Sequence, residues 1–414
     1  MSPRREALRQ RVRLAWLATV VHVRRVAEAI VVGVLGGVTS TIFLRTLSWA
    51  TRTRLDHSWL LWLLPVAGLG VGLLYHHGAG RAAGGNTLIF GEIHEPVEHL
   101  PRRLAPLIFG ATITTHLFGG SAGREGVALQ MAAGATDVVA RAAKWSPLRR
   151  QGLLVVALAA GFAAVFGTPI AGALFALEVP RSGRLRSDAL LPCLVAALVG
   201  SATSRALGIH HDALPTLATF HLTLSSASRL VVLGVGCGLV ALAYVMFVDA
   251  VKHLAHRVIG WAPLRPALGG VAVIALVGLA GTRDYLGLSV ALSDAAVTGA
   301  HVVAAAFAWK LVFTGVTLGS GLQGGEVTPL FVMGSTFGAA VCGPLAFSQP
   351  LAAGLGFVAV FGAAANTPLA CTVLAVELFG GNALVPAAIV CVVATLASGR
   401  RSIYAAQRTE LLAA

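Results

Sequence analysis

The sequence is short of charge. Only 12% of its 414 residues are Asp, Glu, Lys or Arg, and 56% are hydrophobic, whereas an ordinary soluble domain carries about 25% charged residues. The stretch 327–376 contains no Asp, Glu, Lys, Arg or His over 50 residues. Because a spanning helix needs about 20 apolar residues, we predict an all-α integral membrane protein with roughly ten or more embedded segments.

Features of several other protein classes are also missing. Five cysteines lie scattered in apolar segments without a CxxC pair, so we expect small core residues rather than disulfides or metal ligands. There is no HExxH zinc motif, and neither a metal nor a cofactor is expected. The Arg-rich start lacks the apolar core of a signal peptide, so residues 1–25 are predicted to be a cytoplasmic amphipathic segment.

The charge that is present is mostly positive. The net charge is +14, and Lys and Arg gather in short tracts near both termini and between apolar stretches. Such tracts mark cytoplasmic loops, so we expect both termini in the cytoplasm of a multi-pass protein. Nucleic acid is not an expected partner, because no soluble domain with an aromatic-laced basic patch is visible.

Two pairs of similar segments indicate an internal repeat. The segment TPIAGALFALE (168–178) resembles TPLACTVLAVE (367–377), and GSAGREGV (120–127) resembles GSGLQGGEV (319–327). Both pairs recur in the same order at an offset close to half the chain. We therefore predict a first membrane repeat over 26–206, a second over 207–404, and a cytoplasmic tail over 405–414.

The glycine-rich and Thr-Pro segments are typical of broken helix ends inside a membrane. Backbone N–H groups at a helix N-terminus are unpaired and partly positive, which makes them anion sites. Duplicated transporters place such ends at the repeat interface. A carboxylate such as Glu125 can occupy an anion site when ionised and leave it when protonated. These residues alone predict an anion transporter or channel that is linked to protons.

The motifs resemble those of the CLC family of chloride channels and anion/proton antiporters. GREGV (123–127) is similar to the family's GREGP motif, GGEVTP (324–329) stands in the place of GGIFAP, and Tyr404 falls where the family has its central tyrosine. The resemblance implies a CLC-type fold of two inverted-topology repeats with broken membrane helices. It also implies a homodimer in a bacterial inner membrane.

Three departures from the chloride-type pattern resemble the fluoride/proton antiporter subclass. The segment GNTLI (85–89) places Asn86 where a serine is usual, GGEVTP introduces Glu326, and Val179 replaces a second glutamate. The resemblance implies a fluoride/proton antiporter that exports fluoride and gives fluoride resistance. A chloride/proton antiporter and a passive anion channel of the same family remain the alternatives. The partners would be fluoride or chloride, protons and the lipid bilayer.

Each candidate site residue receives a role from this resemblance. Glu125 would be the gating glutamate and Glu326 would couple protons to fluoride. Fluoride is small and strongly hydrated, so replacing its water requires strong donors such as an amide and a hydroxyl. The predicted anion-binding residues are Asn86, Gly126, Val127, Val327, Thr328 and Tyr404.

Other polar residues receive structural interpretations. Arg124 is expected to pair with a nearby carboxylate, and Glu178 and Glu377 are expected to be interfacial or structural. Lys310 needs a carboxylate, a backbone partner or an aqueous vestibule.

Two rival classes are open to test. A membrane enzyme could use Ser320 with His116 or His301 as nucleophile and base, although nothing in the sequence places these residues together. A purely structural membrane protein would not need Glu125 and Glu326 inside apolar segments.

Overall fold

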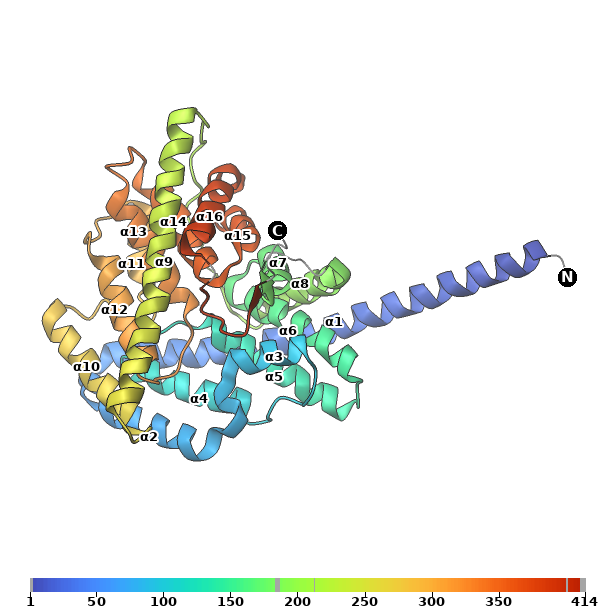
Figure 1. Ribbon diagram of the computed structural model, residues 1–414, viewed down its shortest axis with the longest axis horizontal. Coiled ribbons are helices and arrows are strands. Elements are labelled where there is room, and N and C mark those ends of the chain that lie inside the picture. The colour runs from blue at the N-terminus through green and yellow to red at the C-terminus, as the bar shows by residue number, and fades with distance from the viewer. Residues whose placement is uncertain (1–2, 183–186, 212, 400, 410–414) are drawn as a thin grey trace.

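The structure is a computed structural model that describes residues 3–182, 187–211, 213–399 and 401–409. Most of these residues are helical (Figure 1). The α-helices are α1 (Pro3–Asp56), α2 (Leu64–Leu74), α3 (Gly85–His94), α4 (Leu104–Leu117), α5 (Glu125–Ala142), α6 (Pro147–Phe166), α7 (Pro169–Glu178), α8 (Leu190–Ala206), α9 (Leu224–Val258), α10 (Leu264–Ala280), α11 (Val290–Thr298), α12 (Ala306–Gly319), α13 (Val327–Val341), α14 (Gln349–Ala365), α15 (Pro368–Phe379) and α16 (Leu384–Ser398). Short helices η1 (Ser58–Leu63), η2 (Tyr75–Ala79), η3 (Gly80–Gly84), η4 (Ser187–Ala189) and η5 (Gly381–Ala383) join them, and β1 (Arg181–Ser182) pairs in parallel with β2 (Arg408–Thr409).

The helix lengths fit a membrane protein with interrupted helices. Within the described residues, five helical stretches are long and apolar enough to cross a membrane, at Val20–Asp56, Ser58–His94, Pro147–Phe166, Leu224–Val258 and Gly381–Ser398. Further apolar helices of 10–17 residues accompany them. Since a full crossing takes about 20 residues, these shorter helices are not long enough to cross alone. The predicted all-helical, multi-pass architecture with broken helices is confirmed.

The N-terminal helix runs without a break across the predicted boundary at residue 25. α1 is continuous from Pro3 to Asp56, and Figure 1 shows its first turns extending far from the rest of the molecule. The predicted N-terminal segment and the start of the predicted first repeat thus belong to one helix. The boundaries of the segment and of the two repeats remain predictions.

The two halves of the chain place similar elements in the same order. α5 and α13 each follow a glycine-rich loop, and α7 and α15 each begin with a proline after a threonine. Proline suits the first helical turn because its missing N–H would have no partner there.

α7 and α15 cap each other reciprocally. The carboxylate of Glu178, at the end of α7, accepts hydrogen bonds from the backbone N–H groups of Leu369 (3.1 Å) and Ala370 (2.8 Å) at the start of α15. Glu377 of α15 accepts from Ile170 (3.0 Å) and Ala171 (2.7 Å) at the start of α7. A carboxylate at a helix N-terminus satisfies unpaired donors and complements their partial positive charge. The expected structural role of both glutamates is thus a matched pair of helix caps.

Small residues allow α13 and α14 to cross closely. A Cβ on Gly334 would lie 2.1 Å from the carbonyl oxygen of Gly356, and a Cβ on Gly338 would lie 2.1 Å from that of Ala352. Close approach through small residues is the usual way for membrane helices to gain packing contacts.

The segment after α16 returns to the centre of the molecule (Figure 1). The backbone N–H of Ile403 donates to the carbonyl of Ala364 (2.9 Å), and the side-chain amide of Gln407 donates to the carbonyls of Val179 and Ala365 (both 2.9 Å). These bonds hold Tyr404 beside α7 and α14.

We expect Glu178→Gln and Glu377→Gln each to lower stability by about 1–3 kcal/mol, because each weakens charge-assisted bonds to a buried helix start. Thermal unfolding in detergent measures this. Glu98→Gln is the matched control, because the Glu98 side chain forms an exposed ion pair with Arg81, which contributes about 0–1 kcal/mol. Equal losses in all three variants would contradict the capping role.

We expect Gly334→Ala to destabilise the protein by about 1–3 kcal/mol or more, since the added methyl collides with backbone that cannot rotate away. Gly110→Ala is the control in helix α4, where a Cβ meets nothing within 4 Å. That change should be neutral or stabilising, by up to about 1 kcal/mol. Similar melting temperatures for the two variants would show that the α13–α14 crossing is not tightly packed.

Candidate functional site

The loops that lead into the N-termini of α5 and α13 pair with each other. The backbone N–H of Gly123 donates to the carbonyl of Gly325 (2.6 Å), and the N–H of Gly325 donates to the carbonyl of Gly123 (2.9 Å). A Cβ on Gly123 would lie 2.7 Å from Cδ of Pro329, and one on Gly325 would lie 3.0 Å from the backbone nitrogen of Arg124. The glycines before α5 and α13 are therefore required for this close approach.

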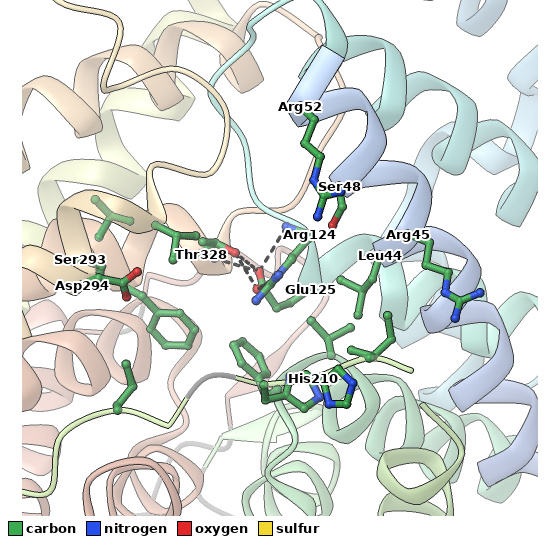
Figure 2. A pocket seen from close by; sticks show the side chains of 18 of the residues that line it. Leu44, Arg45, Ser48, Arg52, Arg124, Glu125, His210, Ser293, Asp294 and Thr328 are labelled. Atoms are coloured by element: carbon green, nitrogen blue, oxygen red, sulfur yellow. Dashed lines mark hydrogen bonds and ion pairs between the residues drawn. The ribbon is translucent and has the colours of Figure 1, made fainter. Parts of the chain in front are cut away.

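The carboxylate of Glu125 lies at the start of α13. It accepts hydrogen bonds from the backbone N–H of Thr328 (2.9 Å) and from the Thr328 hydroxyl (2.6 and 2.7 Å to its two oxygens). Figure 2 shows these contacts together with the Arg124 guanidinium, whose Nε lies 3.3 Å from Glu125 Oε1. Arg124 thus pairs with a nearby carboxylate, as expected.

This arrangement defines a position suited to one negative charge. Glu125 is fully buried, and an isolated charge in such surroundings would be very costly. A helix start, an N–H, a hydroxyl and a guanidinium offset that cost. The same donors could hold a small anion if the carboxylate left.

Other predicted anion-binding residues converge on the same place. The amide nitrogen of Asn86, in the first turn of α3, lies 3.3 Å from where a Cβ on Gly126 would be. The buried ring of Tyr404 packs edge-on against Phe90 of α3 (5.1 Å between centroids) and Phe175 of α7 (6.4 Å). Tyr404 interacts electrostatically with both Glu125 and Glu326.

Val127 and Val327 contribute differently from the rest of the predicted set. Their side chains are buried in two separate apolar clusters. Each residue lies in a first helical turn, where backbone N–H groups have no intrahelical acceptor. Any contact of these two valines with an anion would therefore be made by their backbone N–H groups and not by their side chains.

One cavity borders the gate residues. This gate cavity has a volume of about 690 Å³ and contains Arg124, Glu125 and Thr328 in its lining (Figure 2). Its lining combines three arginines, three carboxylates and two histidines. The ionisable lining residues are Arg45, Arg52, Asp56, Arg124, Glu125, His210, His211 and Asp294.

A second cavity borders Glu326. This α9 cavity has a volume of about 780 Å³ and is lined by one face of α9, including Tyr244, Asp249 and Lys252, and by Glu326 and Arg401. Glu326 immediately precedes α13, so it lies two residues from Thr328 along the chain. The start of α13 therefore borders both cavities: Thr328, which bonds Glu125, lines the gate cavity, and Glu326 lines the α9 cavity.

Lys310 supports the loop that leads into α5. Its buried ammonium donates to the hydroxyls of Ser121 (2.9 Å) and Ser289 (2.8 Å) and to the carbonyls of Gly287 (2.8 Å) and Tyr285 (3.2 Å). The expected need for a backbone partner is met. These bonds join the loop before α5 to the loop before α11.

A buried ion network that the sequence interpretation missed holds α3 in place. Arg150 of α6 is 3% exposed and bonds to Glu92 of α3 (2.7 Å) and Asp137 of α5 (3.0 Å). In the sequence Arg150 follows Arg149 in one of the basic tracts that predict cytoplasmic loops. Nothing in its local sequence distinguishes it from the other basic residues there, because its partners lie 58 and 13 residues away.

Tyr244 and Asp249 were also missed as cavity residues. Asp249 is the one acidic residue of α9, and a charge within an apolar helix is a signal of a polar cavity. Val179 is completely buried in the main apolar cluster, so that position offers no acid.

The rival enzyme site is not assembled. The hydroxyl of Ser320 donates to the carbonyl of Thr317 (3.0 Å), and Nε2 of His116 lies 3.4 Å from the carbonyl oxygen of Gly123. No hydrogen bond between Ser320 and either His116 or His301 occurs in the part of the chain that the structure describes.

Comparison with known proteins agrees with this geometry. The model of the voltage gated chloride channel family matches residues 67–399. A chloride/fluoride channel protein of Pseudomonas syringae pv. tomato is 41% identical over 387 residues, which cover 92% of this chain and 86% of the relative.

Solved structures share the fold. The crystal structure of a CLC-type fluoride/proton antiporter superposes with a TM-score of 0.90 at 35% identity, covering 94% of this chain and 98% of that one. A slow cyanobacterial Cl⁻/H⁺ antiporter has a TM-score of 0.75 at 20% identity, covering 91% and 94%, which supports the fold alone. With the motifs, the paired helix starts and the matched family model in agreement, this chain belongs to the CLC family.

Proposed function

We propose that the protein exports fluoride from the cytoplasm in exchange for entering protons, and so gives fluoride resistance. One observation carries this proposal. At the start of α13, the Glu125 carboxylate accepts hydrogen bonds from the backbone N–H and the hydroxyl of Thr328. An ionised glutamate and a permeating anion would compete for these donors. Protonation removes the carboxylate's charge and releases the position.

The choice of fluoride rests on the donors and on the relatives. Asn86 and Thr328 supply a side-chain amide and a hydroxyl beside the gate, and hard donors suit a small, strongly hydrated anion. The name of the Pseudomonas relative includes fluoride, and the structural neighbour at 35% identity is a fluoride/proton antiporter. Transport, rather than an enzymatic reaction, is the proposed activity.

The proposed exchange cycle uses both glutamates. A proton from the gate cavity neutralises Glu125, which leaves the Thr328 donors, and fluoride arriving from the α9 cavity takes them. Glu125 then passes its proton to ionised Glu326, which releases it to the α9 cavity. Glu125, ionised again, returns to Thr328 and displaces fluoride toward the gate cavity.

We further propose the membrane arrangement that this direction requires. A homodimer in the bacterial inner membrane, with both termini cytoplasmic, fits the Arg-rich start and the basic end of the chain. The α9 cavity, which includes Arg401, would open to the cytoplasm. Exposed apolar side chains on α8 and α16, including Leu191, Leu198 and Val385, fit surfaces covered by lipid or by the second subunit. The repeats are proposed to span 26–206 and 207–404.

We expect purified protein in liposomes to move fluoride uphill when only a pH gradient is imposed. A fluoride electrode follows the anion, and chloride is measured in parallel. Glu125→Gln should abolish proton-driven fluoride movement, because the neutral amide cannot cycle between charged and uncharged forms.

Two results would favour the alternatives. Chloride movement equal to that of fluoride would indicate a chloride/proton antiporter, and fluoride that runs only downhill would indicate a passive anion channel. Absence of any fluoride flux in the unmodified protein would refute the proposal.

We expect Thr328→Val to slow proton-driven fluoride transport about tenfold or more, since one hydrogen bond to a charged group contributes about 1.5–3 kcal/mol. Thr328→Ser keeps the hydroxyl and should retain most of the rate. Both variants are compared in the same electrode assay. Equal loss in the two would mean that the methyl packing of Thr328 matters, not its hydroxyl.

A further inference from the structure

The close packing of α12 on α9 brings the loop before α13 against one face of α9. A Cβ on Gly319 would lie 2.8 Å from Cβ of Val251 and 3.0 Å from the carbonyl oxygen of Val248. The loop 320–326 starts from this contact and ends at Glu326. Tyr244 lies one turn before Val248 on α9, so Glu326 and Tyr244 face the same α9 cavity.

Tyr244 has an unsatisfied hydroxyl. The residue is completely buried, and its hydroxyl has no hydrogen-bond partner among the described residues. Buried hydroxyls nearly always have a partner, because an unpaired one costs about 1–3 kcal/mol. The Glu326 carboxylate lines the same cavity as Tyr244 and is a candidate acceptor for this hydroxyl.

Glu326 lacks a matching partner in the same structure. No hydrogen bond to its side chain occurs within the described ranges, and the residue is partly exposed to the α9 cavity. The charged groups that interact with it are Asp249 and Lys252 of α9. His76, His256, Arg265 and Arg401 also line the cavity. An unpaired acceptor and an unpaired donor therefore lie on facing sides of one cavity.

We propose that Glu326 has a second, inward position in which its carboxylate accepts a hydrogen bond from the Tyr244 hydroxyl. In the position seen here the side chain lines the α9 cavity. In the inward position Tyr244 holds the ionised carboxylate away from water. Tyr244 is thus a positioning residue that acts through Glu326.

This inference rests on the proposed exchange and specifies its proton step. Inward Glu326 carboxylate takes the proton from neutral Glu125, so one O–H bond breaks at Glu125 and one forms at Glu326. Neutral Glu326 has a weaker bond to Tyr244, because a hydrogen bond to a charged acceptor is about twice as strong as one to a neutral acceptor. It then moves to the cavity and gives the proton to water. Tyr244 keeps its own proton throughout.

The test is Tyr244→Phe, which removes the hydroxyl and keeps the buried ring. We expect proton transport to fall about tenfold, the effect of losing one hydrogen bond to a carboxylate, while fluoride still moves downhill. The ratio of protons to fluoride falls with it. Tyr285→Phe is the matched control, because Tyr285 is a buried ring stacked on Trp309 that lines neither cavity.

A double variant separates positioning from general damage. In a Glu326→Gln background, adding Tyr244→Phe should change proton transport no further, because the proton-accepting carboxylate that Tyr244 positions is already gone. An additive loss would overturn the proposal. So would an unchanged proton-to-fluoride ratio with a raised KM for fluoride, which would make Tyr244 an anion contact instead.

A spectroscopic measurement decides the inference even if the exchange itself fails. Infrared difference spectra over a pH titration contain the Glu326 carboxyl band, identified by its loss in Glu326→Gln. We expect Tyr244→Phe to shift that band and Tyr285→Phe to leave it in place. An unshifted band overturns the proposal. Absence of proton-driven transport in the unmodified protein would instead overturn the exchange function.

Discussion

The structure depends on joining two helix N-termini inside an apolar interior. Each start carries unpaired N–H groups and partial positive charge, so bringing α5 and α13 together requires both close approach and a counter-charge. Gly123 and Gly325 permit the approach through paired backbone bonds. Glu125 supplies the charge through Thr328. The adjacent arginine, glutamate and glycines in this otherwise apolar chain follow from that single requirement.

Two further helix N-termini, those of α7 and α15, also receive a carboxylate, but in a different setting. Glu178 and Glu377 also occupy helix starts, but each bonds two backbone N–H groups of the opposite helix and neither borders the gate cavity. Glu125 bonds the hydroxyl and N–H of Thr328 and the N–H and guanidinium of its neighbour Arg124, beside the gate cavity. A carboxylate beside a cavity is suited to gating, whereas one that bridges two helices away from that cavity is suited to capping.

Much of this arrangement could be predicted from the sequence, because its determinants are consecutive residues. The repeat, the broken helices and the convergence of Glu125, Thr328, Asn86 and Tyr404 follow from short motifs. The division predicted at residue 25 stays a prediction, since α1 passes through it as one continuous helix.

What the sequence could not provide are contacts between distant residues. Arg150 resembles any loop arginine until α3 and α5 surround it. The partners of Lys310 come from two loops far apart in the sequence, and Tyr244 gains its position only when α12 packs on α9. Such side chains need the folded arrangement before a role can be assigned.

The central claim is that the Glu125 carboxylate and fluoride compete for the same donors at the start of α13. Fluoride binding to Glu125→Ala, measured by calorimetry beside the unmodified protein, tests it most directly. Truncation empties the position and leaves the Thr328 N–H and hydroxyl free, so the account predicts tighter fluoride binding in the variant. Unchanged or weaker binding would contradict it.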